Sequence, residues 1–177
     1  VNGASISGNF GPLISLAYEE SQKYPGEDLF FVIHAVGGSR LDTQWQPGQV
    51  HYNAFMEKYN NAVSSLTVTQ YMGYAFAQGE SDASFLSSSG AYEANELSLK
   101  AGIFTDTGFT KFISAQLHDI PVGTYPYFAT VQTAKTNNDA TSNYTLITTS
   151  DLAQQGDNVH YTAASYITLG ERFSAAF

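Results

Sequence analysis

Residues 71–82 read Tyr-Met-Gly-Tyr-Ala-Phe-Ala-Gln-Gly-Glu-Ser-Asp, an apolar stretch that changes abruptly into a polar one. The apolar part, 71–77, has the length and aromatic content of a β-strand. The polar part, 78–82, places an amide, a glycine and two carboxylates where that strand ends. In open α/β sheets, ligands bind beyond the carboxyl ends of the strands. This stretch therefore predicts both a sheet strand and one wall of a binding site.

Helical and strand patterns alternate on both sides of this stretch. The run Leu-Phe-Phe-Val-Ile-His-Ala-Val at 29–36 is apolar on both faces, as a central parallel strand is. Further strands are predicted at 144–149 and at 111–117, where a helix is the alternative. The predicted helices are 11–23, 52–66, a stretch within 91–104, 127–135 and a last helix with Thr162 as N-cap. This alternation predicts a three-layer α/β domain with a mainly parallel sheet and right-handed crossovers.

Length and composition limit the classes of protein to consider. A chain of 177 residues predicts one domain, 1–177, and no apolar run reaches the roughly 20 residues of a membrane helix. The net charge of -9 argues against a nucleic-acid partner, which needs clustered Lys and Arg. The absence of cysteine excludes disulfides and a thiol nucleophile. A surface rich in uncharged polar residues favours a secreted, extracellular or phage virion protein.

Asp157 and His160 form the sharpest chemical pattern in the chain. An Asp three residues before a His, in a turn that leads to a helix, can bond one imidazole nitrogen. The other nitrogen is then free to act as a base toward a serine hydroxyl. The alternative is a loop Asp that caps the last helix beside a surface His, and on spacing alone this alternative is favoured.

Two other polar segments are predicted at carboxyl ends of strands. Gln78 has an amide that can donate to an oxyanion, and Gly37 and Gly38 can present backbone N–H groups to the same oxyanion. For both segments the alternative is a tight turn, with Ser81 or Asp82 capping a helix. His34 lies inside an apolar run, where a core histidine is the default, and His51 and His118 lack partners at metal-ligand spacing, so no metal site is expected.

Four segments taken together resemble a known family. They are Gly-Pro-Leu-Ile-Ser-Leu-Ala at 11–17, Ala-Val-Gly-Gly-Ser at 35–39, Gln-Gly-Glu-Ser-Asp-Ala at 78–83 and Asp-Asn-Val-His-Tyr-Thr at 157–162. Their order and spacing resemble the sialate O-acetylesterase and acetylxylan-esterase branch of the SGNH hydrolases, which includes carbohydrate-esterase family six. The resemblance implies the flavodoxin-like SGNH fold from residue 11 to the end of the chain.

The resemblance also implies a role for each matching residue. His160 would be the base and Asp157 its orienting partner. Gly37 or Gly38 would supply an oxyanion N–H, and Gln78 would occupy the place of a further oxyanion donor. Glu80, Ser81 and Asp82 would brace that loop. Trp45, the only tryptophan, would stack on a sugar ring or take a partly buried packing role.

The chain departs from this family at its N-terminus. The family carries its nucleophile in a Gly-Gln-Ser-Asn or Gly-Asp-Ser segment after a first, central strand. Residues 1–10 are too polar and Gly-rich for such a strand, and only Ser5 imitates the nucleophile. We therefore expect the first strand to be missing from this chain. A companion polypeptide or an upstream part of a larger protein would then supply the serine.

The expected function is hydrolysis of acetyl esters on a polysaccharide or glycan by a Ser-His-Asp mechanism, without a cofactor. The partner is an acetylated carbohydrate, not a nucleic acid or a membrane. A first alternative is a non-catalytic glycan-binding module of the same fold, for example in a phage tail protein. A second is a lipase or thioesterase of the same superfamily, against which the polar loops 42–49 and 84–89 argue.

Overall fold

The computed structural model of the protein describes residues 11–118 and 125–177. Its elements are α1 (Leu13–Lys23), α2 (Leu41–Gln44), α3 (Val50–Ser65), β1 (Tyr74–Phe76), η1 (Asp82–Ser84), α4 (Leu86–Thr107), β2 (Phe112–Ala115), α5 (Phe128–Asn138), β3 (Tyr144–Ile147) and α6 (Ala163–Ala176). The strands form one parallel sheet in the order β1-β2-β3. The predicted α/β class with a parallel sheet is confirmed. No helix among the described residues is long and apolar enough to cross a membrane.

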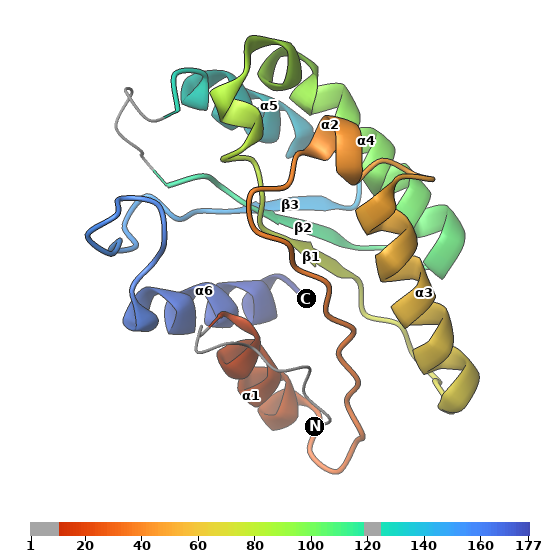
Figure 1. Ribbon diagram of the computed structural model, residues 1–177. Helices are drawn as coiled ribbons and strands as arrows, with labels where there is room; N and C mark the ends of the chain where they lie inside the picture. The colour runs from red at the N-terminus through yellow and green to blue at the C-terminus, as the bar shows by residue number, and fades with distance from the viewer. Residues whose placement is uncertain (1–10, 119–124) are drawn as a thin grey trace.

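Helices cover both faces of the sheet, so the domain has three layers (Figure 1). One face packs against α3, α4 and α5 through an aromatic cluster in which Phe112 lies between Tyr74 and Tyr144. The other face turns Ile113 and Ala115 toward α1 and α6. Alternate residues of β2 therefore serve different layers, as the pleat of a strand requires.

The packing of α1 against α6 depends on a glycine. A Cβ atom at Gly170 would overlap the carbonyl oxygen of Pro12 and Oγ of Ser15, and would lie 2.8 Å from the Leu16 amide nitrogen. Ser15 Oγ donates to the carbonyl oxygen of Ile167 at 2.8 Å, which joins the two helices at the same place. The helix backbones are thus close enough that no side chain fits between them.

Replacing Gly170 with alanine is expected to lower the free energy of unfolding by about 1–3 kcal/mol, because the methyl group meets backbone atoms that cannot move aside. Urea unfolding followed by circular dichroism measures this. Gly90 in α4 is the matched control, since its Cβ would meet nothing within 4 Å. Gly90→Ala should raise stability by up to about 1 kcal/mol, through helix propensity alone. Equal changes in both variants would contradict the close contact.

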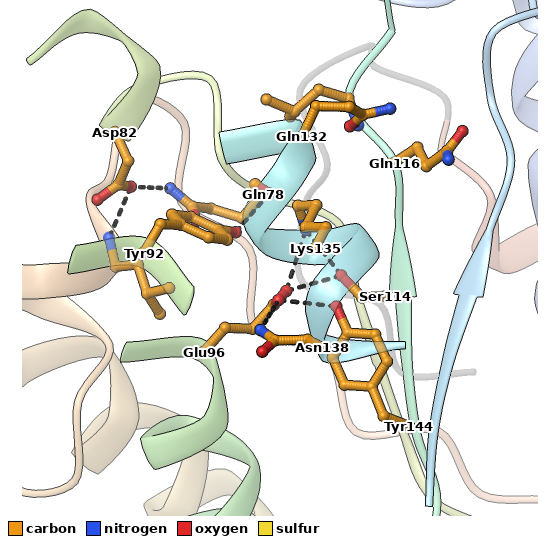
Figure 2. A network of polar contacts seen from close by, with 12 residues as sticks. Gln78, Asp82, Tyr92, Glu96, Ser114, Gln116, Gln132, Lys135, Asn138 and Tyr144 are labelled. Carbon is orange, nitrogen blue, oxygen red and sulfur yellow. Dashed lines mark hydrogen bonds and ion pairs between the residues drawn. The ribbon is translucent and has the colours of Figure 1, made fainter. Parts of the chain in front are cut away.

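A buried network of polar side chains joins the sheet to α4 and α5 (Figure 2). Lys135 Nζ lies 3.0 Å from Glu96 Oε1, and both side chains are completely buried. Ser114 Oγ also donates to Glu96 Oε1, while Tyr144 and Asn138 donate to Glu96 Oε2. Burial alone would raise the pKa of the Glu96 carboxyl, but Lys135 and these donors outweigh it and the pKa lies below its usual value. Glu96 is therefore a charged, fully paired carboxylate inside the core.

The prediction of a strand at 29–36 is wrong. The structure assigns no strand to these residues, and four of the large apolar side chains are exposed: Phe30 by 52%, Phe31 by 37%, Ile33 by 47% and Val36 by 38%. The only described strand that pairs with β1 is β2, so 29–36 has no strand neighbour within the described residues. The run is apolar as predicted, but no described strand lies beside it to make it a central strand.

Candidate active site

The predicted polar segments gather at the carboxyl ends of the strands. In Figure 1 the strands point toward one side of the molecule, where β3 leads into the loop that contains residues 148–162. The turn at 37–40 and the segment 78–82 lie at the same end, joined by hydrogen bonds described below. These segments thus lie at the edge of the sheet where ligands bind in open α/β folds.

The loop before α6 is closed by short-range contacts. Gln154 and Tyr161 form an isolated antiparallel bridge, and the Gln155 N–H donates to the carbonyl oxygen of His160 at 2.7 Å. Asn158 adopts a positive φ of 57°, a left-handed conformation that asparagine tolerates better than most residues. Thr162 caps α6 as predicted, its side chain accepting from the Ser165 N–H. These contacts fold the loop back so that Asp157 faces His160.

Asp157 uses both carboxylate oxygens to orient His160. One oxygen, Oδ1, accepts the backbone N–H groups of Val159 at 3.0 Å and of His160 at 2.9 Å. The other, Oδ2, lies 2.6 Å from His160 Nδ1. The hydrogen bond from the imidazole and those from the two amides lower the pKa of Asp157 to about 2. The carboxylate is therefore charged at neutral pH and fixes which ring nitrogen faces it.

His160 is open on its other side. Its side chain is 65% exposed, and within 11–118 and 125–177 no hydrogen bond to Nε2 is found. A free nitrogen on an oriented imidazole can take a proton from a hydroxyl or from water. No serine or threonine hydroxyl of the described residues is hydrogen-bonded to it. Ser5, the nucleophile candidate within this chain, lies outside the described residues.

The diglycine turn at 37–38 presents open backbone groups. Gly38 has a φ of 70°, both glycines are exposed, and a Cβ at either would meet nothing within 4 Å. Within the described parts of the chain, neither N–H group has a backbone acceptor. The turn is anchored one residue later, where Ser39 Oγ donates to the carbonyl oxygen of Val36 at 2.7 Å. Its N–H groups are thus available to an anion.

The hydrogen bonds of Gln78 differ from the prediction that its amide donates to an oxyanion. Its side chain is buried, and Nε2 donates to the carbonyl oxygen of Ser39 at 3.0 Å and to Asp82 Oδ2 at 2.6 Å. The Tyr92 hydroxyl donates to the backbone carbonyl oxygen of Gln78 at 2.9 Å and lies 3.1 Å from its side-chain Oε1 (Figure 2). Since an amide nitrogen carries only two hydrogens, none is left for an oxyanion. In this arrangement Gln78 connects the end of β1 to the diglycine turn.

Asp82 is a second support of the same turn. Its Oδ2 also accepts the backbone N–H of Leu41 at 2.9 Å, and its side chain is fully buried. Burial raises the pKa of the Asp82 carboxyl, and the bonds from Leu41 and Gln78 counteract part of that rise. Tyr92 was not predicted from the sequence. Its ring is completely buried within a helix, and a buried tyrosine needs a partner for its hydroxyl.

Replacing Gln78 with alanine is expected to lower the free energy of unfolding by about 1–3 kcal/mol, because Ser39 and Asp82 lose a buried donor, whereas Tyr92 keeps its bond to the backbone carbonyl oxygen of residue 78. Chemical denaturation of the two proteins measures the difference. Gln70→Ala, at an exposed residue before β1, is the control and should change stability by less than about 0.5 kcal/mol. An unchanged stability at Gln78 would mean that its amide is not the connection described above.

The remaining predicted site residues take different positions. Trp45 is 4% exposed, its Nε1 donates to Ser39 Oγ at 2.8 Å, and its ring packs on Phe76, so it cannot stack on a sugar. Burial raises the pKa of Tyr161 to about 12, and the charge of Glu80 adds to the rise. The Glu80 side chain itself is half-buried. Among the described residues, no three His, Asp or Glu side chains come together as a metal site.

Comparisons with known proteins agree with this fold. The model of the family "carbohydrate esterase, sialic acid-specific acetylesterase" matches residues 4–177. A protein from Arabidopsis thaliana solved by X-ray crystallography is similar with a TM-score of 0.78 at 19% identity, over 95% of this chain and 68% of that one. The crystal structure of NanS is similar with a TM-score of 0.54 at 10% identity, over 75% of this chain and 53% of that one. No curated protein matches the sequence.

The two structural likenesses concern the fold, because their sequence identities are low. The family match covers nearly the whole chain, including the Gly37–Gly38 turn, the segment after β1 and the His160 loop. The chain belongs to the carbohydrate esterase family of sialic acid-specific acetylesterases.

Proposed function

We propose that this protein removes acetyl groups from a carbohydrate by a Ser-His-Asp mechanism in which His160 is the base. The observation that carries the proposal is the 2.6 Å contact between His160 Nδ1 and Asp157 Oδ2, at the carboxyl edge of the sheet. The family to which the chain belongs supports the class of reaction and of substrate.

The first half of the reaction forms an acetyl-enzyme. A serine Oγ attacks the acetyl carbonyl carbon while its proton passes to His160 Nε2. Asp157 stabilises the resulting imidazolium, because its carboxylate is charged and faces Nδ1. The carbonyl oxygen becomes an oxyanion that accepts hydrogen bonds from the backbone N–H groups of Gly37 and Gly38. When the tetrahedral intermediate collapses, the C–O bond to the sugar breaks and the sugar oxygen takes the proton from His160.

The second half regenerates the enzyme. Water attacks the acetyl carbonyl carbon and gives a proton to His160. The bond from the carbon to serine Oγ then breaks, the serine oxygen takes the proton from His160, and acetate is released. Gln78 and Asp82 act on both halves only through the turn, since they hold Ser39 and Leu41 in place. We assign them as positioning residues rather than as donors to the oxyanion. The serine comes from polypeptide outside the described residues, either Ser5 or a segment beyond this sequence.

A fluorophosphonate probe tests the proposal, since it reacts only with an activated serine. The full-length protein should gain one probe molecule on a single serine, identified by mass spectrometry of its peptides. Labelling should fall to background in His160→Ala, because the serine then has no base. A full-length protein that hydrolyses acetyl esters but never takes up the probe would refute the serine mechanism.

A glycan-binding module without activity is the second candidate. The observation that favours it is that His160 has no hydroxyl partner within the described residues. The two functions differ in product: an esterase releases acetate from an acetylated polysaccharide, whereas a binding module retains the polysaccharide unchanged. Acetate release by the full-length protein, with no retention of the deacetylated polymer, would exclude the binding module.

A further inference from the structure

Phe85 is an exposed aromatic residue at the carboxyl edge of the sheet. It lies between η1 and α4, three residues after the segment 78–82 that supports the diglycine turn, and it is 49% exposed. Its backbone is fixed, because its N–H donates to the carbonyl oxygen of Asp82 at 3.1 Å and its own carbonyl oxygen accepts the Ser89 N–H at 3.0 Å. The next residue, Leu86, is 66% exposed. Apolar surface of this kind beside a candidate active site is typical of a ligand-binding site.

Arg40 holds the Phe85 ring from one side. Its guanidinium carbon lies 4.7 Å from the centre of the ring, a cation–π contact. Arg40 follows the diglycine turn by two residues, and Leu41 beside it is bonded to Asp82 at 2.9 Å, so the ring and the turn share one support. The guanidinium is itself held, because its Nη2 donates to Asp42 Oδ2. Since half of the residue is still exposed, Phe85 keeps an open surface for a ligand.

The positive charges of the chain all belong to described residues. The sequence contains seven lysines and arginines, and none of them lies in 1–10 or in 119–124. Five of them donate hydrogen bonds away from the candidate site: Lys23 to Glu20 and Ser174, Lys58 to Ile33, Lys100 to Thr141 and Ser142, Lys111 to Phe177, and Lys135 to Glu96 and Ser114. Only Arg40 and Arg172 therefore lie close enough to meet a charged ligand at the carboxyl edge.

Both of these arginines are paired with an aspartate. Arg40 pairs with Asp42, and Arg172 pairs with Asp151 of the loop after β3 at 2.5 Å. The same loop carries Asp157, whose carboxylate is charged at neutral pH because its pKa is about 2. A sugar carboxylate would thus meet no lysine or arginine of the described chain that is free of an aspartate, and Asp157 would repel it. An uncharged sugar meets no such penalty.

We propose that the open surface of Phe85 is the platform on which the sugar of the substrate stacks, and that this sugar is uncharged. The inference rests on the proposed function, because it names the sugar for the same site. The C–H groups of a pyranose face can be buried against the ring while the hydroxyl groups stay in water. Phe85 thereby takes the role that the sequence predicted for Trp45, whose ring is buried.

Steady-state kinetics of the full-length protein on acetylated xylan, an uncharged polymer, tests the platform. Phe85→Leu keeps an apolar side chain but lacks a flat ring, and should raise KM about 3- to 30-fold with a smaller change in kcat. Phe85→Trp restores an aromatic face and should return KM to within about twofold of wild type. Tyr18→Ala is the control, since it removes a ring that is 61% exposed from α1, on the other face of the sheet (Figure 1). It should leave KM unchanged.

An O-acetylated sialic acid, which carries a carboxylate, tests the charge of the sugar. Wild-type kcat/KM should be at least about tenfold lower for this substrate than for acetylated xylan, because the site repels an anion. Added salt should narrow the difference by screening the repulsion. Asp42→Asn leaves Arg40 without its carboxylate, and should raise kcat/KM for the sialic acid about two- to fivefold relative to that for xylan.

Equal KM values for wild type and Phe85→Leu, or a Phe85→Trp protein that is worse than Phe85→Leu, would mean that Phe85 only fills space. A wild type that prefers the sialic acid, or an Asp42→Asn protein without the expected gain, would overturn the uncharged sugar. Hydrolysis of p-nitrophenyl acetate, which has no sugar, separates this inference from the proposed function. A wild type that hydrolyses it but not acetylated xylan overturns the inference alone, whereas a wild type that hydrolyses no acetyl ester overturns both.

Discussion

His160→Ala in the full-length protein is expected to lower kcat/KM for acetyl esters by about 10⁴- to 10⁶-fold, because the serine then has no group to take its proton. The imidazole is largely exposed and its removal breaks only the bond to Asp157 among side chains, so the fold should persist. Hydrolysis of p-nitrophenyl acetate and of an acetylated polysaccharide measures the loss, and circular dichroism checks the fold.

Two aspartates near the loop provide a matched comparison for this result. Asp157→Asn keeps the shape but removes the charge that orients the ring, and should lower kcat by about 10⁴-fold. Asp151, which pairs with Arg172 at 2.5 Å, is also exposed and lies six residues earlier in the sequence. Asp151→Asn should leave kcat within about threefold of wild type. A His160→Ala protein that retains a tenth of the activity would remove this imidazole from the mechanism.

Lys135→Met is expected to lower the free energy of unfolding by about 3–5 kcal/mol, because it leaves the Glu96 carboxylate buried without its ion-pair partner. Lys135 Nζ also donates to Ser114 Oγ at 2.7 Å and lies 5.2 Å from the centre of the Tyr92 ring, and both contacts are lost. Urea unfolding measures the change. A variant that unfolds at the same urea concentration as wild type would contradict a charged pair in the core.

The control for this prediction is a lysine of similar chemistry in α4. Lys100 donates to Thr141 Oγ1 at 3.0 Å and to the carbonyl oxygen of Ser142 at 2.9 Å, near the surface. Lys100→Met should cost less than about 1 kcal/mol. In a Lys135→Met/Glu96→Gln double variant the unpaired charge is gone, so the loss should be smaller than the sum of the two single losses.

Features set by neighbouring residues were predictable from the sequence. The N-cap at Thr162 and the Asp157–His160 contact each depend on residues three positions apart, and the structure contains both. The parallel sheet also followed from the alternation of apolar runs and helical patterns, although β1, β2 and β3 are shorter than predicted. The short helices α2 and η1 were not predicted.

Features set by distant residues were not predictable in the same way. The run at 29–36 has the composition of a central strand, but whether it becomes one depends on a neighbour that no local pattern reveals. The direction in which Gln78 donates is decided by Tyr92, Asp82 and Ser39, up to 39 residues away. Trp45 lies in a polar stretch of sequence, yet its ring is buried because it packs on Phe76 and its Nε1 donates to Ser39 Oγ.

The base and the oxyanion turn differ in how far along the chain their supports lie. The Asp157–His160 bond spans three residues, whereas the turn depends on bonds that span 39 and 41 residues. Closing a short loop costs little chain entropy, so the His160 ring stays oriented by Asp157 even when tertiary packing loosens. On gentle warming, such an enzyme should therefore lose activity first because the turn at 37–38 loosens and no longer binds the anion, while Asp157 still orients His160.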